Sequence, residues 1–461
     1  MEPLRVAVVG AGLVGPLAAL LLQREGPGRG LAPVVTLFER DEGPWTRDQG
    51  TSLDLGPKAL AALGRAGVER EVADATRHGS ACMLVLAPDG REIMRMEVPA
   101  FLAKMGPEPN EVNRNELRNC MLVAFEAAGG DLRWGCDVVD GRTSGGDGAS
   151  AAPVELSLRD GTSAGTFDIV IVASGSNQNR LRNLVFDDSG HDAFTGYATV
   201  QGFVLDPVSR APQAHQLVGA GSALICADSG QTSMFTMRYA SDEADQRLCF
   251  YASCPVATTA SLVEEVAQCP GDDTSTRSRV WAERRLASDE WSPALRELVG
   301  AADWCVMRNF YQQPANPVLR ERAARTPLVA IGDALHAMLP HQGAGVNTGM
   351  LDAIDIADAI LAAASCRSHD EVVARLRATE QKMIARSAPL VTASYDACVA
   401  FHAPRSADNV AKLRPFLGGT PLRVLQAMRG IEVAVGTDHL WPAIGFTVVA
   451  AAVAVAMKWW W

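Results

Sequence analysis

The stretch "LRVAVVGAGLVG" at residues 4–15 decides the fold of the N-terminal part of the chain. Residues 4–10 form a short apolar, β-branched run that ends at a glycine, which is typical of a buried parallel strand. Gly10, Gly12 and Gly15 give the spacing GxGxxG where a helix is expected to begin. The first glycine allows a tight turn, the second lets a pyrophosphate approach the backbone, and the third lets the helix pack on the strand. The intervening Leu13 and Val14 belong to the same predicted phosphate-binding turn.

A second strand, "VVTLFERD" at 34–41, places Glu39 near its end, 24 positions after Gly15. A carboxylate at this place can accept hydrogen bonds from both hydroxyls of an adenosine ribose, and it would repel a 2′-phosphate. Strand, glycine turn, helix and acidic residue together predict dinucleotide binding. The alternative is a glycine-rich turn without a ligand, and this pattern does not distinguish NAD from FAD.

A second glycine-rich loop, "IGDALHAMLPHQGAGVNTGM", runs from 331 to 350 after another apolar run. A dinucleotide needs only one phosphate loop, so we expect the second loop to hold a different part of one long cofactor. Asp333, after Gly332 at the strand end, can hold a ribityl hydroxyl. Gly343 and Gly345 let backbone N–H groups come close to a flavin ring.

The loop from Pro340 to Asn347, including Val346, is therefore expected to wrap around the flavin. The helix after Asn347 would direct its positive end at the flavin edge where charge collects on reduction. The two loops together predict that the cofactor is FAD.

Composition and charge limit the other possibilities. The 461 residues are 48% hydrophobic and 21% charged, which is ordinary for a globular protein. The net charge of -11 and the pI near 5.3 make nucleic acid an unsuitable partner. The ten cysteines have no metal-ligand spacing, so no metal site is expected, and they fit reduced thiols in the cytoplasm.

The chain length predicts two domains in an α/β fold: a Rossmann-like, dinucleotide-binding domain, an inserted, mostly antiparallel β substrate domain, and C-terminal helices. Helices are expected over 56–76 and 113–129, and a hairpin over 82–98. The expected boundaries are 1–81, 99–190 and 320–365 for the FAD-binding domain, 82–98 and 191–319 for the substrate domain, and 366–437 for the C-terminal helices.

The C-terminal segment 440–457, "LWPAIGFTVVAAAVAVAM", has 18 residues without a charge and is followed by Lys458 and three tryptophans. As a helix it would approach the thickness of a bilayer core, with tryptophans at both interfaces. It is expected to be a transmembrane or membrane-associated helix that leaves the catalytic domain in the cytosol. The alternative is a buried helix of the last layer.

Several stretches resemble a known family, the single-component FAD-dependent aromatic hydroxylases. They are "FERD" (38–41), "GTSLDLGPKAL" (50–60), "EVNRNELR" (111–118), "DIVIVASG" (168–175), "GDALHAMLPHQGAGVN" (332–347) and "LDAIDIADAI" (351–360). The nearest resemblance is to the tetracycline-inactivating flavin monooxygenases, with a weaker similarity to kynurenine 3-monooxygenase.

The resemblance implies a monooxygenase in which NADPH or NADH visits as a transient co-substrate and reduces FAD. Reduced flavin and O2 would give a C4a-hydroperoxide, which hydroxylates a small aromatic or polycyclic substrate. It also implies that Arg118 contacts FAD, that Arg40 lies beside the adenosine, and that Gln201 contacts substrate. Arg238 belongs to the same expected sheet and is a second substrate candidate. A monomer or weak dimer is expected.

One departure from the family concerns the pair after the "DIVIVA" strand, which is Ser174-Gly175 here where the family usually has Asp-Gly. Arg182 does match the family. Catalytic acid or base residues stay unassigned: His336 and His341 flank the second loop, and a structural role is favoured for both. The rival functions are a non-hydroxylating flavoprotein, either reductase or oxidase, and a membrane-anchored binding protein that has lost redox activity.

Overall fold

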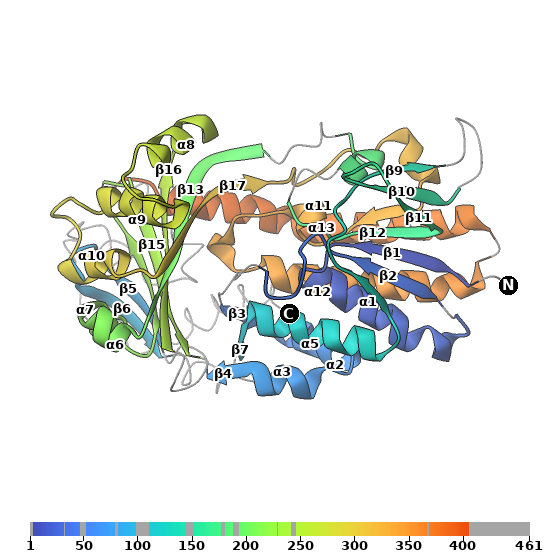
Figure 1. Cartoon of the computed structure of the whole chain (residues 1–461), viewed down its shortest axis with the longest axis horizontal. Helices are drawn as coiled ribbons and strands as arrows, with labels where there is room; N and C mark the ends of the chain where they lie inside the picture. Colours follow the sequence, from blue (N-terminus) through green and yellow to red (C-terminus); the bar gives the residue numbers. More distant parts are fainter. Residues whose placement is uncertain are drawn as a thin grey trace, which may run out of the picture. The chain divides into compact units, whose positions relative to one another are not determined.

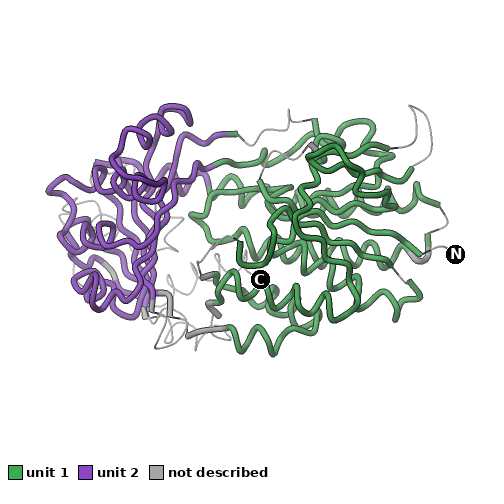
Figure 2. The backbone as a smooth tube through the Cα atoms, viewed as in Figure 1, with its two compact units in different colours: residues 1–76, 112–193, 311–394 green, residues 77–111, 194–310, 395–461 purple. Residues whose placement is uncertain are grey.

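The computed structural model describes residues 3–31, 33–46, 52–78, 82–97, 110–143, 152–176, 180–187, 193–227, 229–240, 246–366 and 368–404. The chain folds into two compact units (Figure 2). Unit 1 contains residues 1–76, 112–193 and 311–394, and unit 2 contains 77–111, 194–310 and the residues from 395 onward. Each unit therefore collects segments that are distant in the sequence.

A five-stranded parallel sheet forms the centre of unit 1, in the order β18-β12-β1-β2-β8. The three central strands are apolar and almost wholly buried, as parallel strands covered on both faces must be. The strands are β1 (Arg5–Val9), β2 (Val34–Phe38), β8 (Asp131–Arg133), β12 (Ile169–Val172) and β18 (Leu328–Ala330).

Helices cover one side of this sheet and a second, three-stranded sheet lies on the other side (Figure 1). Phe38 and Phe167 meet edge to face across that layer, with ring centroids 5.7 Å apart. Asn113 caps the helix that was expected over 113–129, because its Oδ1 accepts from the N–H groups of Asn115 and Glu116. The elements are α1 (Val14–Glu25), α5 (Arg114–Ala127), α12 (Gly345–Leu361), β9 (Val138–Thr143), β10 (Val154–Leu158) and β11 (Ser163–Phe167).

The single helix expected over 56–76 is wrong. The structure has two helices, α2 (Pro57–Arg65) and α3 (Glu69–Ala75), separated at Gly67, whose φ is +71°. A side chain at Gly67 would also meet the Arg24 guanidinium. The remaining elements of this part are β3 (Ser52–Leu55), β4 (Thr76–His78) and β7 (Asn110–Asn113), which form a small sheet, and the short helices η1 (Pro27–Arg29), η2 (Arg180–Leu184), η3 (Glu321–Arg325), α11 (Asp333–His336), η4 (Pro340–Gln342) and η5 (Ala362–Ser365).

Unit 2 is built on a mixed seven-stranded sheet, in the order β17-β13-β16-β15-β14-β5-β6. The hairpin expected over 82–98 is present as β5 and β6. The sequence prediction of mainly strands over 194–310 overlooked most of the helices that cover one face of the sheet (Figure 1). The elements are β5 (Cys82–Leu86), β6 (Glu92–Glu97), β13 (Ala193–Leu205), β14 (Ser222–Cys226), β15 (Ser233–Ala240), β16 (Gln246–Pro255), β17 (Trp304–Gln312), α6 (Pro207–Arg210), α7 (Pro212–Val218), α8 (Thr259–Ala267), α9 (Thr274–Arg285) and α10 (Pro293–Gly300).

The expected C-terminal helices begin with one 33-residue helix, α13 (His369–Phe401). Its residues up to Ser394 belong to unit 1 and those from Tyr395 to unit 2, so α13 is not a separate layer. In the described ranges no helix is both long and apolar enough to cross a membrane. The expected membrane segment, 440–457, lies outside the described residues.

A buried charge network in unit 1 fixes the second glycine-rich loop to α12 and α13. The Asp352 carboxylate accepts from the Gly332 N–H at 2.9 Å, lies 2.6 Å from His336 Nε2, and pairs with Arg386 at 2.6 Å. Asp352 is 0% exposed and His336 is 2% exposed. Because a buried ionised carboxylate is tolerated only when paired, these partners restrain the loop strongly.

The network affects two pKa values in opposite directions. Burial disfavours the imidazolium, but the charge and hydrogen bond of Asp352, the charge of Asp333 and a backbone hydrogen bond together outweigh burial and raise the pKa of His336 above its usual 6.5. Burial alone would raise the pKa of Asp352, but His336, Arg386 and the Gly332 N–H together lower it. The His336 contribution to stability is therefore fully present below pH 6.5 and is lost as the pH rises through the raised pKa.

We predict that His336→Gln reduces the pH dependence of unfolding above pH 6.5. Each unit by which the pKa is raised corresponds to about 1.4 kcal/mol, so the wild-type free energy of unfolding should fall more steeply than that of the variant as the pH increases. Urea unfolding between about pH 6 and pH 9 measures this difference. Glu380, whose pKa burial raises to about 7, is unchanged in both proteins and serves as common background. Parallel pH curves would contradict the prediction.

Candidate functional site

Four neighbouring strands of the unit 1 sheet end at one edge, and each is followed by a residue that the sequence singled out. Gly10 follows β1, Glu39 follows β2, Ser174 follows β12 by two residues, and Gly332 follows β18 by two residues. Carboxyl ends of parallel strands form the usual binding edge of an open α/β sheet, where the strand order reverses. The two glycine-rich loops thus lie at the same edge although they are more than 300 positions apart in the sequence.

Direct contacts between α1 and the second loop show this convergence. A Cβ added to Gly332 would lie 3.1 Å from Val14 Cγ2. A Cβ added to Gly349, on α12, would lie 2.6 Å from the same Val14 atom. The distance at Gly349 is shorter than real Cβ contacts. Val14 therefore fills the space that the missing side chains leave, and α1 and α12 pack directly against one another.

The three glycines of the first turn differ in whether protein packing requires them. Gly10 has φ +108° and a Cβ there would lie 2.5 Å from the Ala173 carbonyl oxygen, while a Cβ at Gly15 would lie 2.1 Å from the Gly10 oxygen. Protein packing thus explains both. A Cβ at Gly12 meets no atom within 4 Å among the residues the structure describes. Packing does not require this glycine, which fits a position left small for an approaching ligand.

Glu39 and Arg118 form a buried support beneath the first turn. Glu39 Oε2 accepts from the Ala11 N–H at 2.9 Å, its Oε1 accepts from the Asp41 N–H at 3.0 Å, and Arg118 Nη2 lies 3.3 Å from Oε2. Both residues are 6% exposed. A carboxylate oxygen can accept more than one hydrogen bond, so these contacts leave Glu39 able to bind a ribose hydroxyl.

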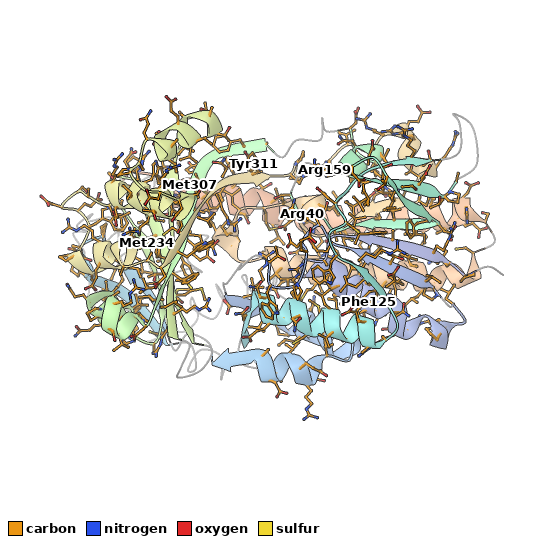
Figure 3. The ribbon with its side chains drawn as sticks, in the orientation of Figure 1. Arg40, Phe125, Arg159, Met234, Met307 and Tyr311 are labelled. Atoms are coloured by element: carbon orange, nitrogen blue, oxygen red, sulfur yellow. The ribbon has the colours of Figure 1, made fainter. Side chains whose placement is uncertain are left out.

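Arg118 acts on the first turn from behind. Its Nε donates to the Ala11 carbonyl and its Nη1 to the Pro44 carbonyl at 3.3 Å. The geometry thus places Arg118 in support of the turn, which the family resemblance did not predict. Arg40 is exposed and lies at the carboxyl end of the parallel sheet (Figure 3).

The second loop presents an open, glycine-rich backbone. Gly332 has φ +59°, and Asp333, which follows it, is exposed as the first residue of α11. Gly343 has φ +61°, and the described residues place nothing within 4 Å of a Cβ there. A Cβ at Gly345, the first residue of α12, would have Asp333 Oδ1 as its neighbour at 3.9 Å. The Asp333 carboxylate therefore lies close to the first residue of α12.

Asn347 and Arg182 hold this loop in place. Asn347 Oδ1 accepts from the Gly56 N–H at 2.7 Å, and its Nδ2 donates to the Asp54 carbonyl at 2.9 Å. Arg182 is buried and its Nε donates to the Ala334 carbonyl at 2.8 Å. The side chain of Asn347 is engaged with backbone, so a cofactor contact from this residue would come from its main chain.

The remaining expected residues lie in several environments. Leu13 is buried, Val346 packs against the core of unit 1, Pro340 begins η4, and His336 belongs to the Asp352 network. The contacts of His336 support its structural role. Sequence reasoning overlooked Asp352 and Arg386, because a charged residue on a helix is usually exposed.

The two substrate candidates, Gln201 and Arg238, lie on opposite faces of the unit 2 sheet. Along β15, Arg238 alternates with Met237 and shares its side with Met234, which belongs to the core beneath the helices. Burial and then the charge of Arg238 lower the pKa of His215 on α7, which places Arg238 near the helix layer. Gln201 lies on the other face, so one ligand on that face would not reach both.

The residues around the strand ends fit a bound FAD. Besides the open positions at Gly12 and Gly343, the Ser174 Oγ is buried without a hydrogen-bond partner in the described part of the chain. Buried polar atoms are normally paired, so an orphaned hydroxyl at this edge indicates a missing ligand or water. The backbone N–H groups at two helix starts can donate to phosphates, and the carboxylates of Glu39 and Asp333 can accept from sugar hydroxyls.

Comparisons with known proteins give the same result. A family model described as FAD binding domain matches residues 3–387. Hispidin-3-hydroxylase of Neonothopanus nambi is 24% identical over 371 residues, which cover 76% of this chain and 79% of that protein. HpxO of Klebsiella pneumoniae, solved with FAD and uric acid, has a TM-score of 0.67 at 19% identity and covers 93% of this chain and 96% of its own. Tetracycline destructase Tet(51) has a TM-score of 0.58 at 15% identity, over 94% and 100% of the two chains.

The two solved structures show a shared fold, and the family model covers most of the chain. The resemblance that the motifs indicated is therefore confirmed. The chain belongs to the FAD binding domain family, and its cofactor is FAD.

Proposed function

We propose that the chain is a FAD-dependent monooxygenase that uses NAD(P)H and O2 to hydroxylate a small aromatic or polycyclic molecule. The proposal rests on one observation: the GxGxxG turn after β1 and the Asp333 loop after β18 lie at the same edge of the sheet, on either side of β12, and Val14 packs against Gly332 and Gly349 there. Curated relatives are hydroxylases and monooxygenases, which supports the reaction class.

The first turn and its neighbours would hold the adenine half of FAD. The pyrophosphate would lie over Gly12 at the start of α1, where unpaired N–H groups and the helix dipole favour negative charge. Glu39 would accept from the adenosine ribose hydroxyls, and Arg40 would lie beside the adenosine. Arg118 would keep the Ala11 carbonyl turned toward itself, so that the backbone of the turn keeps its shape.

The second loop would hold the flavin half. Asp333 would bind a ribityl hydroxyl, and the backbone of Gly343, Gly345 and Val346 would lie against the ring system. The start of α12 would place its positive dipole end near the part of the ring that gains charge on reduction. When bound, FAD supplies the redox chemistry by accepting a hydride from NAD(P)H and activating O2.

Ser174 bears on the choice of reductant. A serine hydroxyl keeps a hydrogen bond at the position where the family usually has a carboxylate, and it adds no negative charge beside the pyrophosphate. Nicotinamide binding close to this strand end would therefore depend on hydrogen bonding and less on charge. The rates of FAD reduction by NADPH and by NADH can be compared directly to test which reductant this site prefers.

A matched pair of substitutions tests the first turn. Gly12→Ala should fold normally, because a Cβ there meets no described atom within 4 Å, but it should bind FAD at least about tenfold more weakly because the methyl group blocks the pyrophosphate. Gly15→Ala should destabilise the protein by about 3 kcal/mol or more, because its Cβ would overlap the Gly10 carbonyl at 2.1 Å.

Flavin absorbance after gel filtration gives the FAD content, and thermal unfolding gives the stability of each variant. Equal FAD affinity of Gly12→Ala and the wild type would contradict the assignment of the pyrophosphate to this turn. A stable Gly15→Ala would contradict the packing that brings α1 onto β1.

A turnover experiment tests the reaction class. The purified protein should be yellow, and NADPH or NADH oxidation by the holoenzyme should accelerate when a phenolic or polycyclic compound is added. Product mass should increase by one oxygen atom, with label from ¹⁸O2. Oxidation that never responds to an aromatic compound would instead favour a flavin reductase or oxidase, and a protein that refuses added FAD would contradict the proposal as a whole.

A further inference from the structure

The face of the unit 2 sheet opposite the helices bears a cluster of polar side chains. Along β13, Ala198 and Val200 belong to the core beneath the helices, so Thr199 and Gln201 point to the other face. The same alternation on β16 puts Ala252 and Cys254 in that core and Ser253 on the face with Thr199. Met234 of β15, labelled in Figure 3, marks the core side of the neighbouring strand.

Four residues form a continuous line on this face, which we call the polar stripe. Thr199 pairs across the sheet with Ser253, and Ser253 pairs with Ser233 of β15. The two serine Oγ atoms are 2.9 Å apart, and each lies 3.1 Å from Nε2 of His402, which follows α13. All four are buried, with exposed fractions of 2% for Thr199, 5% for Ser253, 3% for Ser233 and 6% for His402.

The hydrogen bonds of His402 determine what the stripe offers to a ligand. His402 Nδ1 lies 2.8 Å from the Cys398 carbonyl, which can only accept, so Nδ1 bears the proton and Nε2 of the neutral ring is an acceptor. One serine then donates to Nε2 and the other donates within the triangle. Because the serine protons are used in this way, the capacity that remains at the serines is mainly for accepting hydrogen bonds.

Thr199 supplies the second observation. Its Oγ1 is buried and makes no hydrogen bond with any residue that the structure describes. Other buried hydroxyls on this sheet are paired, for example Thr236, whose Oγ1 donates to the Cys249 carbonyl at 2.8 Å. A buried hydroxyl without a hydrogen bond lowers the free energy of unfolding, and a bound polar group that pairs with it would remove this penalty.

The surroundings of the stripe are aromatic. The Tyr197 and His402 rings lie 4.8 Å apart, and Phe235 and Tyr251 lie 6.5 Å apart with a 39° tilt. No member of the stripe is a carboxylate or a permanent cation. Of the arginines on these strands, Arg238 lies on the opposite face, Arg247 stacks on Phe203 at 5.0 Å, and Arg308 is exposed. A buried carboxylate would need a cation as partner, whereas a neutral hydroxyl needs only a donor and an acceptor.

We propose that the polar stripe is a subsite that binds a hydroxyl group of a neutral aromatic substrate. Thr199 would donate a hydrogen bond to the substrate oxygen, and the serine–histidine triangle would accept a hydrogen bond from the substrate O–H. This inference rests on the proposed function, because it describes the substrate of the same enzyme. It specifies the substrate class: a phenol or alcohol should bind at the stripe in preference to an aromatic carboxylate.

Calorimetric titration of the FAD-loaded enzyme with 2-naphthol and 2-naphthoate tests the ligand class. These probes have the same ring system and differ in the group that the stripe would meet. The wild type should bind 2-naphthol more tightly than 2-naphthoate. Binding of 2-naphthoate with equal or higher affinity, or no binding of 2-naphthol, would overturn the inference.

The variant Thr199→Val tests the residue. It removes one hydroxyl at nearly constant volume, and it should weaken 2-naphthol binding about threefold to tenfold, the range for one hydrogen bond. Because the hydroxyl has no partner among the residues that the structure describes, ligand-free Thr199→Val should unfold at the same temperature as the wild type or higher. A purely structural role, for example through a bound water, would instead lower the unfolding temperature and leave the 2-naphthol affinity unchanged, which would overturn the inference.

Thr236→Val is the matched control, since it removes a paired hydroxyl from the other face of the same sheet. It should lower the unfolding temperature and leave 2-naphthol binding within twofold of the wild type. Failure of the subsite can be distinguished from failure of the proposed function. If the protein is yellow and its NADPH oxidation responds to other aromatic compounds, the proposed function holds. If Thr199→Val then leaves the affinity for 2-naphthol unchanged, only the subsite is refuted.

Discussion

The close approach of α1 to the second glycine-rich loop is the constraint on which the cofactor site depends. Val14 occupies the space at Gly332 and Gly349 where side chains would otherwise stand. Any larger residue at Gly349 would push α12 away from α1 and separate the two loops. Glycine has a conformational cost inside a helix, about 1 kcal/mol relative to alanine, and here the close packing of α1 and α12 offsets that cost.

The buried charges behind the loop give this arrangement its rigidity. Asp352 joins the Gly332 N–H, His336 and Arg386, and thus connects the strand end, the short helix α11 and the long helix α13. A second pair, Arg377 and Glu380, links α13 to β18, because Glu380 accepts from the Ala330 N–H at 3.3 Å and Arg377 donates to the Leu328 carbonyl. Burial raises the pKa of Glu380 and lowers the pKa of Arg377, so desolvation dominates both groups.

The sheet of unit 2 divides its chemistry between its two faces. The face beneath α6 to α10 is an apolar core that includes Phe250, Trp281 and Trp291. The opposite face mixes aromatic rings with serine, threonine and histidine hydrogen bonds. The buried Thr199 hydroxyl on the second face has no hydrogen-bond partner in the described part of the chain, which fits a surface shaped for a ligand.

Local sequence patterns were sufficient to predict the glycine turn after β1, the carboxylate after β2, and the glycine loop after β18, because each motif is short and has one physical explanation. The sequence also predicted the helix over 113–129, which the structure shows as α5. It did not reveal the break at Gly67, most of the helices over 194–310, or the side of the sheet that Arg238 occupies. Tertiary structure decided those features, together with the buried partners Asp352 and Arg386 and the line from Thr199 to His402. Their residues are far apart in the chain, and only packing determines which charges and hydroxyls are removed from water together.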